Sequence, residues 1–538
     1  MIDRPTPDGP TQRLSGGLSP NASDYARENK NRMIRVGLWA ALLAAAVAVS
    51  YIALNNIVVP IVVLILVMTP VIVWKYPRAT LYITIASVCL FELYPMSMPD
   101  SMTDMVPFFW NVNTVFQIYA HVNFKAIPVS VFEFFVIVSA VGSAFRAVYG
   151  GNLALRFGKL VWPILGYMAF VAFAWANGSV TGGDYKISLQ EVRSQVYFFV
   201  AYLMTVNLIR DRKQIHIMLW ICSIAIAFKG ILYTYRRYVT LHNMPLSDQG
   251  VGSHEEAFLF GAFIILLMAL GACKANVKLR RFMWLLLPLV LLGDAATNRR
   301  AGTAGLLIAV PMLVLMAWKY YPKRRRSIQI AALVGGVTFF VYFSAFKNSE
   351  SLIAQPAHAL ESHYNPDPRD ASSNAYRDAE DADLYATIKL NPLFGYGYGK
   401  KMMHAVPIAD ISGFYEYWDT IPHDQILWIW MRVGTLGAIA FWMMICAIII
   451  RAVHVGDFAD TPDDLKAVCM FAVGAIAMLM VFGLLDLQIS NYRDMLFVGV
   501  CTGLIEVVAS LSKFDGANNV SSPVVLESPR ALALKGPG

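Results

Sequence analysis

The chain has 538 residues, of which 57% are hydrophobic and only 15% are charged. An average soluble protein carries about 25% charged residues, and no water-soluble core needs so much apolar side chain. A soluble enzyme, a secreted disulfide scaffold and a disordered chain are therefore excluded. Apolar runs of about 20 residues recur along the sequence and predict an all-α polytopic membrane protein. The net charge of +8 fits this class, because cytoplasmic loops of membrane proteins collect Lys and Arg.

Both ends of the chain are predicted to be disordered cytoplasmic tails. Residues 1–33 are rich in Pro, Gly and Ser, and residues 512–538 are rich in Asn, Ser and Pro. We expect no signal peptide, because no small-residue cleavage site follows the first apolar run.

Apolar runs separated by polar breaks predict about fourteen transmembrane helices. Eleven lie within residues 34–346 and three within residues 425–511. Their approximate limits are 34–54, 57–74, 79–97, 128–146, 160–177, 195–209, 215–235, 257–273, 282–296, 301–318, 328–346, 425–450, 465–486 and 493–511. The pair at 34–74 is broken only by two asparagines, and a re-entrant hairpin is the alternative there.

Every second short loop is basic, which predicts that both termini are cytoplasmic. Within these loops the cations are Lys75, Arg78, Arg146, Arg156, Lys159, Arg210, Arg212, Lys213, Lys274, Lys278, Arg280, Arg281, Lys319, Lys323, Arg324, Arg325 and Arg326. Residues 347–424 form the one long outer loop. Its apolar positions at helical spacing, from Tyr376 to Ile388, end at Asn391-Pro392, so we expect a partly helical extracytoplasmic cap.

Several arginines lie on the outer face, where the positive-inside rule does not place them: Arg193, Arg236, Arg237, Arg299, Arg300 and Arg377. A single arginine near a membrane surface commonly reaches toward lipid phosphates. As a group, however, these side chains predict an anion site, because the guanidinium grips phosphate with two parallel hydrogen bonds. A phosphorylated lipid is the expected ligand. Lys229 and Arg432 lie within spans, where each is either a site residue or neutralised by a neighbouring helix.

His423 begins the twelfth span, and its imidazole is suited to act as a general base. A surface or capping histidine is the alternative reading, and Asp424 is equally explained as an acid in the first turn of a helix. The six cysteines form no CxxC pair, His254-Glu255-Glu256-Ala257-Phe258 lacks the second histidine of HExxH, and His358, Glu361 and His363 have only chance spacing. We expect no metal site and no cofactor.

The stretch Asn391-Pro392-Leu393-Phe394-Gly395-Tyr396-Gly397-Tyr398-Gly399, followed by His423-Asp424 and Gly434-x-x-Gly437, resembles the hallmark of the O-antigen ligase/polymerase-like superfamily. In that family a P-x-x-G-x-G turn in a long periplasmic loop precedes a His-Asn pair that opens a span. Thr297-Asn298-Arg299-Arg300-Ala301-Gly302 is similar to an upstream family element, and the resemblance covers about residues 190–450. Asp424 replaces the usual Asn, and Arg432 replaces the usual acid.

The resemblance implies a metal-independent glycosyltransferase of the GT-C type in the bacterial inner membrane. Such an enzyme takes a glycan from a polyprenyl-diphosphate lipid on the periplasmic face and passes it to a glycan or lipid acceptor. His423 is then the catalytic residue, and Arg193, Arg299, Arg300 and Arg377 bind the diphosphate. Asp424, Tyr396 and Tyr398 position the substrate, although packing under the cap is the other use of the two tyrosines.

Two classes of function remain open. One is an enzyme of exopolysaccharide or O-antigen synthesis, either a ligase or a polymerase, with a slight preference for the polymerase. Polysaccharide-assembly proteins are then possible partners. The other is a polytopic transporter or flippase of a lipid-linked or anionic substrate. No matched halves are found in the sequence, and the asymmetric cap also argues against a transporter.

Overall fold

The computed structural model describes residues 58–92, 106–121, 129–149, 155–241, 251–349, 354–366, 368–413 and 415–514, together with residues 39, 44, 103 and 516. The predicted tails, apart from residues 512–514 and 516, fall outside this part of the chain. So does most of the predicted span 34–54.

Every predicted span from 57–74 onward overlaps a helix, although the helix in the span 79–97 ends at Leu90 and residues 93–97 lie outside the described part of the chain. These helices are α2 (Val58–Lys75), α3 (Pro77–Leu90), α5 (Val131–Tyr149), α6 (Val161–Val180), α7 (Tyr185–Leu208), α8 (Arg212–Tyr235), α9 (His254–Ala272), α10 (Val277–Thr297), α11 (Arg300–Tyr320), α12 (Arg325–Phe346), α15 (Gln425–Asp457), α16 (Asp463–Leu485) and α17 (Tyr492–Leu511). Shorter helices are α4 (Val112–Ala120), η1 (Arg236–Thr240), η2 (Pro322–Arg324), α13 (Gln355–Tyr364) and α14 (Pro368–Ile388).

The all-α polytopic class is confirmed. Nine helices in the described ranges are long and apolar enough to cross a membrane. The count of fourteen spans stays a prediction. α12 is the clearest lipid-facing helix, because none of its side chains is buried and most of them are apolar.

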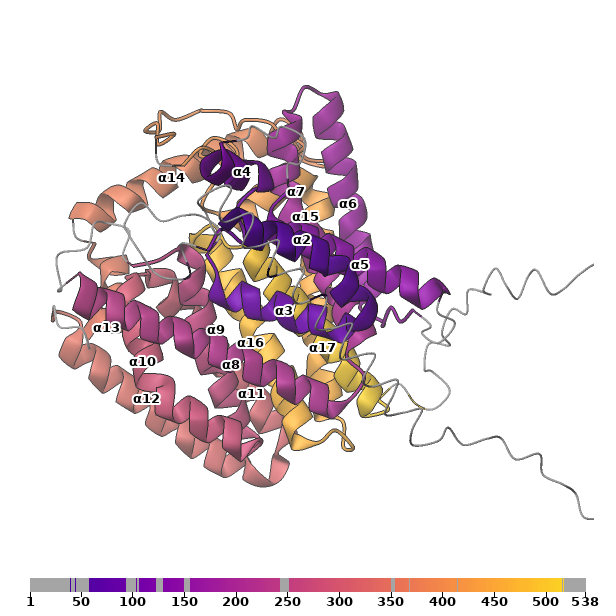
Figure 1. Ribbon diagram of the computed structural model, residues 1–538. Coiled ribbons are helices and arrows are strands. Elements are labelled where there is room, and N and C mark those ends of the chain that lie inside the picture. The colour runs from indigo at the N-terminus through magenta and orange to yellow at the C-terminus, as the bar shows by residue number, and fades with distance from the viewer. Residues whose placement is uncertain are drawn as a thin grey trace, which may run out of the picture. The chain divides into compact units, whose positions relative to one another are not determined.

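The chain divides into two compact units. The smaller combines Met1–Val67 with Val112–Pro128, and the larger combines Met68–Asn111 with Val129–Gly538. In Figure 1, α10 and α12 lie to the left of α16 and α17. The helices α16 and α17 are buried along most of their length, and they pack against α7, α9, α11 and α15.

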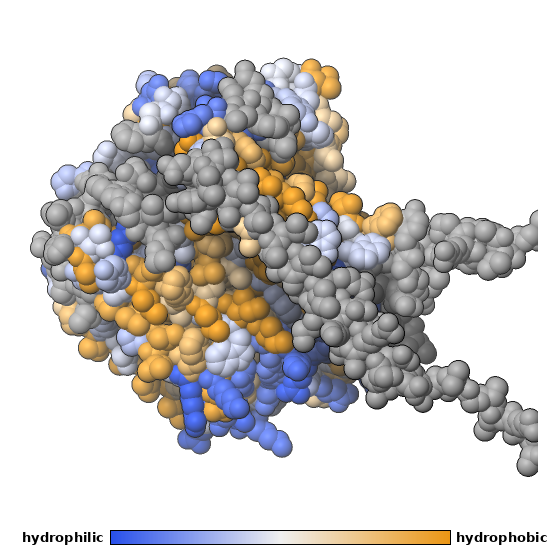
Figure 2. Space-filling view, in the orientation of Figure 1, coloured by the Kyte–Doolittle hydropathy of each residue, from blue (hydrophilic) through white to orange (hydrophobic). Residues whose placement is uncertain are grey.

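Successive helices of the larger unit alternate in direction. Arg212 at the start of α8 pairs with Asp464 at the start of α16 at 2.5 Å, and Lys319 near the end of α11 lies 3.6 Å from Asp457 at the end of α15. The predicted basic loops therefore gather at one end of the bundle, which we call the basic end. The starts of α7, α9, α11, α15 and α17 lie at the other, the cap end. Figure 2 shows hydrophilic residues at the lower edge of the view, below a broad hydrophobic area.

This alternation leads to a topology prediction. A reporter enzyme fused near residue 324 should be active in the cytoplasm, and one fused near residue 365 should be active on the outer face, because positive loops are retained inside. Reporter activity of the two fusions in intact cells is the measurement. A cytoplasmic reporter at residue 365 would contradict the predicted sidedness of the cap.

Candidate functional site

The cap segment, residues 354–424, is organised by α14. The predicted helix at Tyr376–Ile388 is confirmed, and it begins earlier, at Pro368. Leu384 and Ile388 are buried, which explains the apolar spacing seen in the sequence. The same buried face of α14 also carries the carboxylates of Glu380 and Asp383, which hold the start of α15 and the cap loop.

His423 lies against α14 through Glu380. The Glu380 carboxylate accepts a hydrogen bond from the His423 backbone N–H at 2.8 Å and lies 3.1 Å from the ring atom Nδ1. Tyr376, one turn earlier on α14, packs edge-on against the imidazole with ring centroids 5.9 Å apart. The Glu380 side chain is 1% exposed, whereas that of His423 is 19% exposed. The carboxylate is thus enclosed, and the imidazole forms the exposed member of the pair.

The pairing fixes which nitrogen of His423 is available for chemistry. A carboxylate only accepts hydrogen bonds, so Nδ1 carries the proton that faces Glu380. The proton-free nitrogen of the neutral ring is then Nε2, for which the described part of the chain provides no partner. A carboxylate that orients a histidine in this way is the arrangement found behind catalytic bases.

A second histidine–carboxylate pair lies one turn further along α14. His404 Nδ1 is 3.0 Å from Asp383 Oδ2, and the ring stacks on Trp418 at 5.3 Å. The other oxygen of Asp383 accepts backbone hydrogen bonds from Ala405 and Val406. This pair holds the loop that follows the glycine-rich turn, residues 395–399. His404 is therefore a suitable control residue for His423.

The glycine-rich turn seals the cap segment onto α15. Gly395 and Gly397 adopt positive φ angles of 85° and 87°. A Cβ on Gly395 would lie 2.2 Å from the Arg432 carbonyl oxygen, so no other residue fits. The turn's N–H groups bond the Met431 and Arg432 carbonyls, which are left open because α15 is interrupted at Gly434.

Arg432 is the buried anchor of this junction. Its Nη2 lies 2.6 Å from Glu191 of α7, and its guanidinium donates hydrogen bonds to the carbonyls of Gly397 and Thr420. Glu191 also accepts hydrogen bonds from the Gly399 N–H and the Trp428 indole. Both charged side chains are fully buried. The expected alternative of neutralisation by a neighbouring helix is therefore what the structure shows for Arg432.

The two tyrosines of the turn occupy different environments. Tyr398 is fully buried, receives a hydrogen bond from Gln195 at 2.9 Å and packs against Trp428. This position agrees with the packing alternative. Tyr396 is half-buried, and Lys400 Nζ lies 4.7 Å from its ring centroid, so one face of its ring is used by a cation.

Arg300 connects the start of α11 to the cap. Its guanidinium lies 3.3 Å from Asp370 and 3.3 Å from the Asn374 amide oxygen, both on α14, and 3.4 Å from Ser362 on α13. Arg299 precedes it as the N-cap residue of α11. Arg300 therefore fixes the two cap helices to the bundle, and its charge is paired with that of Asp370.

Arg193 reaches the same end from α7. It pairs with Glu133 of α5 at 2.9 Å, and its guanidinium carbon lies 5.6 Å from the ring centroid of Tyr492. Its charge also acts on Tyr417 of the cap segment. Burial raises the pKa of Tyr417 above its usual value, and the positive charge of Arg193 partly opposes this shift. Arg193 is thus held by the bundle, and its charge is near enough to influence Tyr417 of the cap segment.

Arg377 lies on α14 itself, three residues before Glu380. Three residues correspond to about 4.5 Å along a helix axis. The Arg377 Nε atom is buried and has no hydrogen-bond partner among the described residues. An unsatisfied buried donor is costly, so a bound acceptor at this point would be stabilised.

Carboxyl groups cluster around the same turn of α14. Burial raises the pKa of Asp381 to about 7, with further contributions from the carboxylates of Asp424, Glu380 and Asp378, and Arg377 opposes the shift. Asp424 caps α15 by accepting hydrogen bonds from the N–H groups of Ile426 and Leu427 at 2.9 and 2.8 Å. The capping alternative for Asp424 is therefore present in the structure.

The raised pKa of Asp381 predicts a pH-dependent stability. In the unfolded chain an aspartate titrates near pH 3.9, so the folded protein binds the proton more tightly. The stabilisation is complete below about pH 4 and is lost as the pH rises through about 7. We expect the midpoint of thermal unfolding to fall between pH 5 and pH 8, and to fall less in Asp381→Asn. Asp460→Asn, an exposed residue at the basic end, should retain the wild-type pH dependence. An equal decline in wild type and Asp381→Asn would contradict this assignment.

The remaining cations divide by environment. Lys229 is buried and contacts Glu92, with Glu256 at 3.4 Å, and Arg493 binds Glu256 at 2.9 Å. These four residues form a buried ionic network at the cap end of α3, α8, α9 and α17. Arg236 and Arg237 begin η1 after α8, where Arg236 is buried.

Sequence reasoning missed the two glutamates on which the site depends, Glu380 and Glu191. Neither has a distinctive neighbourhood in the sequence, since Glu380 is one of several acids in a polar helix and Glu191 lies among polar residues before an apolar run. A signal was present for Glu191, because a buried arginine at position 432 requires a counter-charge.

Comparison with known proteins agrees with this part of the structure. The O-antigen ligase family model matches residues 282–442, which include Arg299, Arg300, the cap segment, His423 and Arg432. No curated protein matches the chain. The family match confirms the similarity to the O-antigen ligase-like superfamily and supports, in general, an O-antigen ligase-like membrane glycosyltransferase.

Proposed function

We propose that this protein transfers glycan repeat units from a polyprenyl-diphosphate lipid to a glycan or lipid acceptor on the periplasmic face of the bacterial inner membrane. The observation that carries the proposal is the His423–Glu380 pair, in which a buried carboxylate orients a partly exposed imidazole at the start of α15. The family match to residues 282–442 supports glycosyl transfer as the class of reaction.

The reaction follows from the orientation of His423. The acceptor hydroxyl oxygen attacks the anomeric carbon of the donor sugar, and the bond between that carbon and the diphosphate oxygen breaks. The electron pair of that bond leaves with polyprenyl diphosphate. The hydroxyl proton passes to Nε2 of His423, whose positive charge is then stabilised by Glu380.

In this mechanism the arginines stabilise the negative charge of the leaving group. Negative charge grows on the diphosphate as the glycosidic bond breaks, so fixed guanidinium groups stabilise the transition state more than the ground state. Arg377 is the nearest along α14 and has a buried nitrogen without a described hydrogen-bond partner. We assign it to the diphosphate, with Arg193, Arg299 and Arg300 supplying further positive charge at the same end of the bundle.

Tyr396 and Asp424 remain the proposed positioning residues beside His423. Tyr396 belongs to the glycine-rich turn, where its ring is half-buried, and Asp424 is the N-cap residue of α15. Within this function we favour polymerisation of repeat units over ligation, because Asp424 stands where the family has Asn. No metal and no cofactor are assigned a role.

The assignment of Arg377 leads to a prediction. Arg377→Lys keeps the positive charge but loses the planar fork, so transfer should fall about 10- to 100-fold, which corresponds to one lost charge-assisted hydrogen bond. The rate of glycan transfer in membranes is the measurement. Arg326→Lys, on an exposed residue at the basic end, should leave the rate unchanged. Wild-type activity in Arg377→Lys would mean that this guanidinium does not grip the diphosphate.

The proposed function is tested by lipid analysis of a strain in which the gene is deleted. If the protein consumes polyprenyl-linked glycan, single lipid-linked repeat units should accumulate and return to the wild-type level on complementation. A polymerase is further distinguished by loss of long chains, with attachment of single units to the acceptor retained. An unchanged pool of lipid-linked glycan would contradict the proposal.

A further inference from the structure

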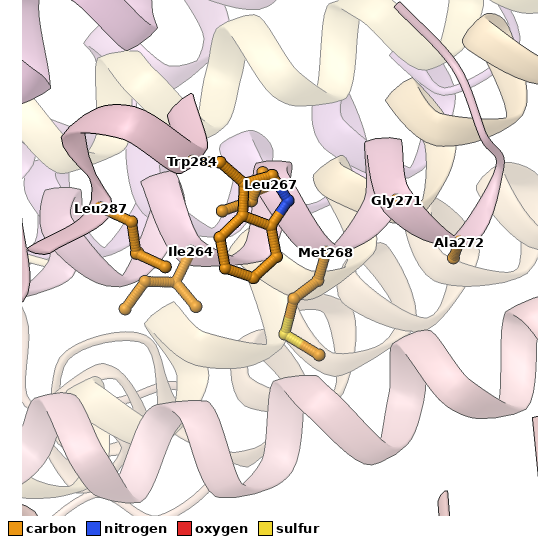
Figure 3. Close-up of a pocket in the computed structure, with 7 residues that line it drawn as sticks. All are labelled: Ile264, Leu267, Met268, Gly271, Ala272, Trp284 and Leu287. Carbon is orange, nitrogen blue, oxygen red and sulfur yellow. The ribbon is translucent and has the colours of Figure 1, made fainter. Parts of the chain in front are cut away.

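An apolar pocket lies between α9 and α10, away from the cap (Figure 3). Its volume is about 380 Å³, and it is lined by Ile264, Leu267, Met268, Gly271, Ala272, Trp284 and Leu287. These positions belong to the second half of α9 and the first half of α10, so the pocket lies toward the basic end. None of the residues that line it carries a charge.

The pocket is open at Gly271, because glycine has no side chain to fill it. The lining residues of α9 recur every three or four positions, so they share one face of the helix. Gly271 lies on that face, and a Cβ added there would meet no atom within 4 Å. Trp284 supplies the α10 side and is 60% exposed, so its indole is accessible to a molecule in the pocket. Figure 3 shows its ring beside Leu267 and Met268.

Four cations surround the turn that joins these two helices: Lys274, Lys278, Arg280 and Arg281. Arg280 and Arg281 come four and three residues before Trp284, so they lie one helical turn from the indole on a shared face. No Asp or Glu occurs between Gly271 and Gly293 in the sequence. Asp464 of α16 approaches the turn through His216, which contacts Asn276, and this carboxylate is paired with Arg212 and His216. The pocket therefore has an apolar interior at membrane depth and a positively charged rim at its membrane-surface end.

We propose that this pocket binds an anionic phospholipid, with one acyl chain between α9 and α10 and the phosphate at the cations of the α9–α10 turn. Charge complementarity selects this occupant, because basic residues beside a membrane attract anionic lipid headgroups. The indole lies one helical turn from Arg280 and Arg281, and this position suits the interface between headgroup and acyl chain. The glycan donor is not the occupant, since its diphosphate is assigned to the arginines at the cap end. The lipid site stands independently of the proposed transfer reaction.

Quenching of Trp284 fluorescence by brominated phospholipids tests the proposal. The full-length protein is reconstituted in bilayers that contain increasing fractions of brominated phosphatidylglycerol or brominated phosphatidylcholine. Each form is compared with its own Trp284→Phe counterpart, so that the difference reports Trp284 alone. Half-maximal quenching should require about tenfold less phosphatidylglycerol than phosphatidylcholine, given the effect of several basic residues on anionic lipid.

Two variants separate the headgroup site from the chain site. Arg280→Gln/Arg281→Gln should remove the preference for phosphatidylglycerol, and Gly271→Leu should reduce quenching by both lipids because its side chain fills the pocket. Gly166→Leu on α6, where an added Cβ also meets no atom within 4 Å, is the matched control and should behave as wild type. Equal quenching by the two lipids in wild type would overturn the proposal, as would a preference that survives in both variants.

Discussion

Replacing His423 by alanine is expected to lower glycan transfer by about 10²- to 10⁴-fold, the contribution typical of a general base. The expectation follows from the geometry, because the Glu380 carboxylate holds Nδ1 and leaves Nε2 to accept the acceptor's proton. Folding and donor binding should be retained, since the ring is partly exposed and α15 is capped by Asp424. Transfer by purified protein and binding of the lipid donor are the paired measurements.

His423→Gln sharpens this test, because glutamine keeps a hydrogen-bonding group but has no nitrogen that titrates. Loss in both variants supports a base. Activity retained in Gln and lost in Ala means that His423 only orients the acceptor. His404→Gln is the matched control, because His404 is also paired with a carboxylate of α14 but serves the cap loop. Near-normal activity in both His423 variants would contradict the catalytic assignment.

Removing Arg432 is expected to cost the folded protein about 3–5 kcal/mol, the penalty for leaving a buried charge without its partner. Arg432→Met leaves the buried carboxylate of Glu191 without its ion-pair partner. The substitution also removes the hydrogen bonds to the carbonyls of Gly397 and Thr420. The glycine-rich turn should then detach from α15. Thermal unfolding in detergent, followed by the loss of the monodisperse peak in size-exclusion chromatography, is the measurement.

Two further variants show whether the charge is the cause. Glu191→Leu/Arg432→Met removes both charges, so it should be more stable than Arg432→Met alone. Arg326→Ala removes an exposed arginine at the basic end and should change the unfolding temperature little. If Arg432→Met is as stable as Arg326→Ala, the Arg432–Glu191 pair does not hold this junction.

The sequence predicts the helices well because each membrane span is one continuous apolar segment of the chain. The apolar run at 425–450 and the helix Gln425–Asp457 are one example, and the apolar spacing from Tyr376 to Ile388 is another. Both depend on neighbours a few residues apart, and a lipid environment makes the helix obligatory. Sequence also identifies the glycines of the turn, since the positive φ of Gly395 and Gly397 is a local requirement.

The site depends on contacts that the sequence does not contain. Glu380 is 43 residues from His423, and Glu191 is far from Arg432 along the chain. The outer-face arginines were recognised by charge alone, yet their partners differ. Arg300 is bound to the cap helices, Arg193 to Glu133, and only the buried Nε of Arg377 has no described hydrogen-bond partner among these three. Which arginine meets the diphosphate therefore becomes a sharper question once the folded chain is known.

Lys229 and Arg432 illustrate the same limit. Each is a cation inside an apolar run, and the sequence alone leaves a functional site and a structural ion pair equally open. The structure pairs Arg432 with Glu191, and Lys229 with Glu92 and Glu256. In both cases the counter-charge comes from another helix, so only the packing of the bundle decides between the two readings.

Release of polyprenyl diphosphate by purified protein in lipid vesicles directly tests whether His423 drives glycan transfer from this donor. With a polyprenyl-diphosphate-linked glycan and an acceptor present, wild-type protein and His404→Gln should release one polyprenyl diphosphate for each glycan transferred. His423→Gln should release almost none while it still binds the donor. Equal release by His423→Gln and wild type, or no release by wild type with any lipid-linked glycan, would contradict the account.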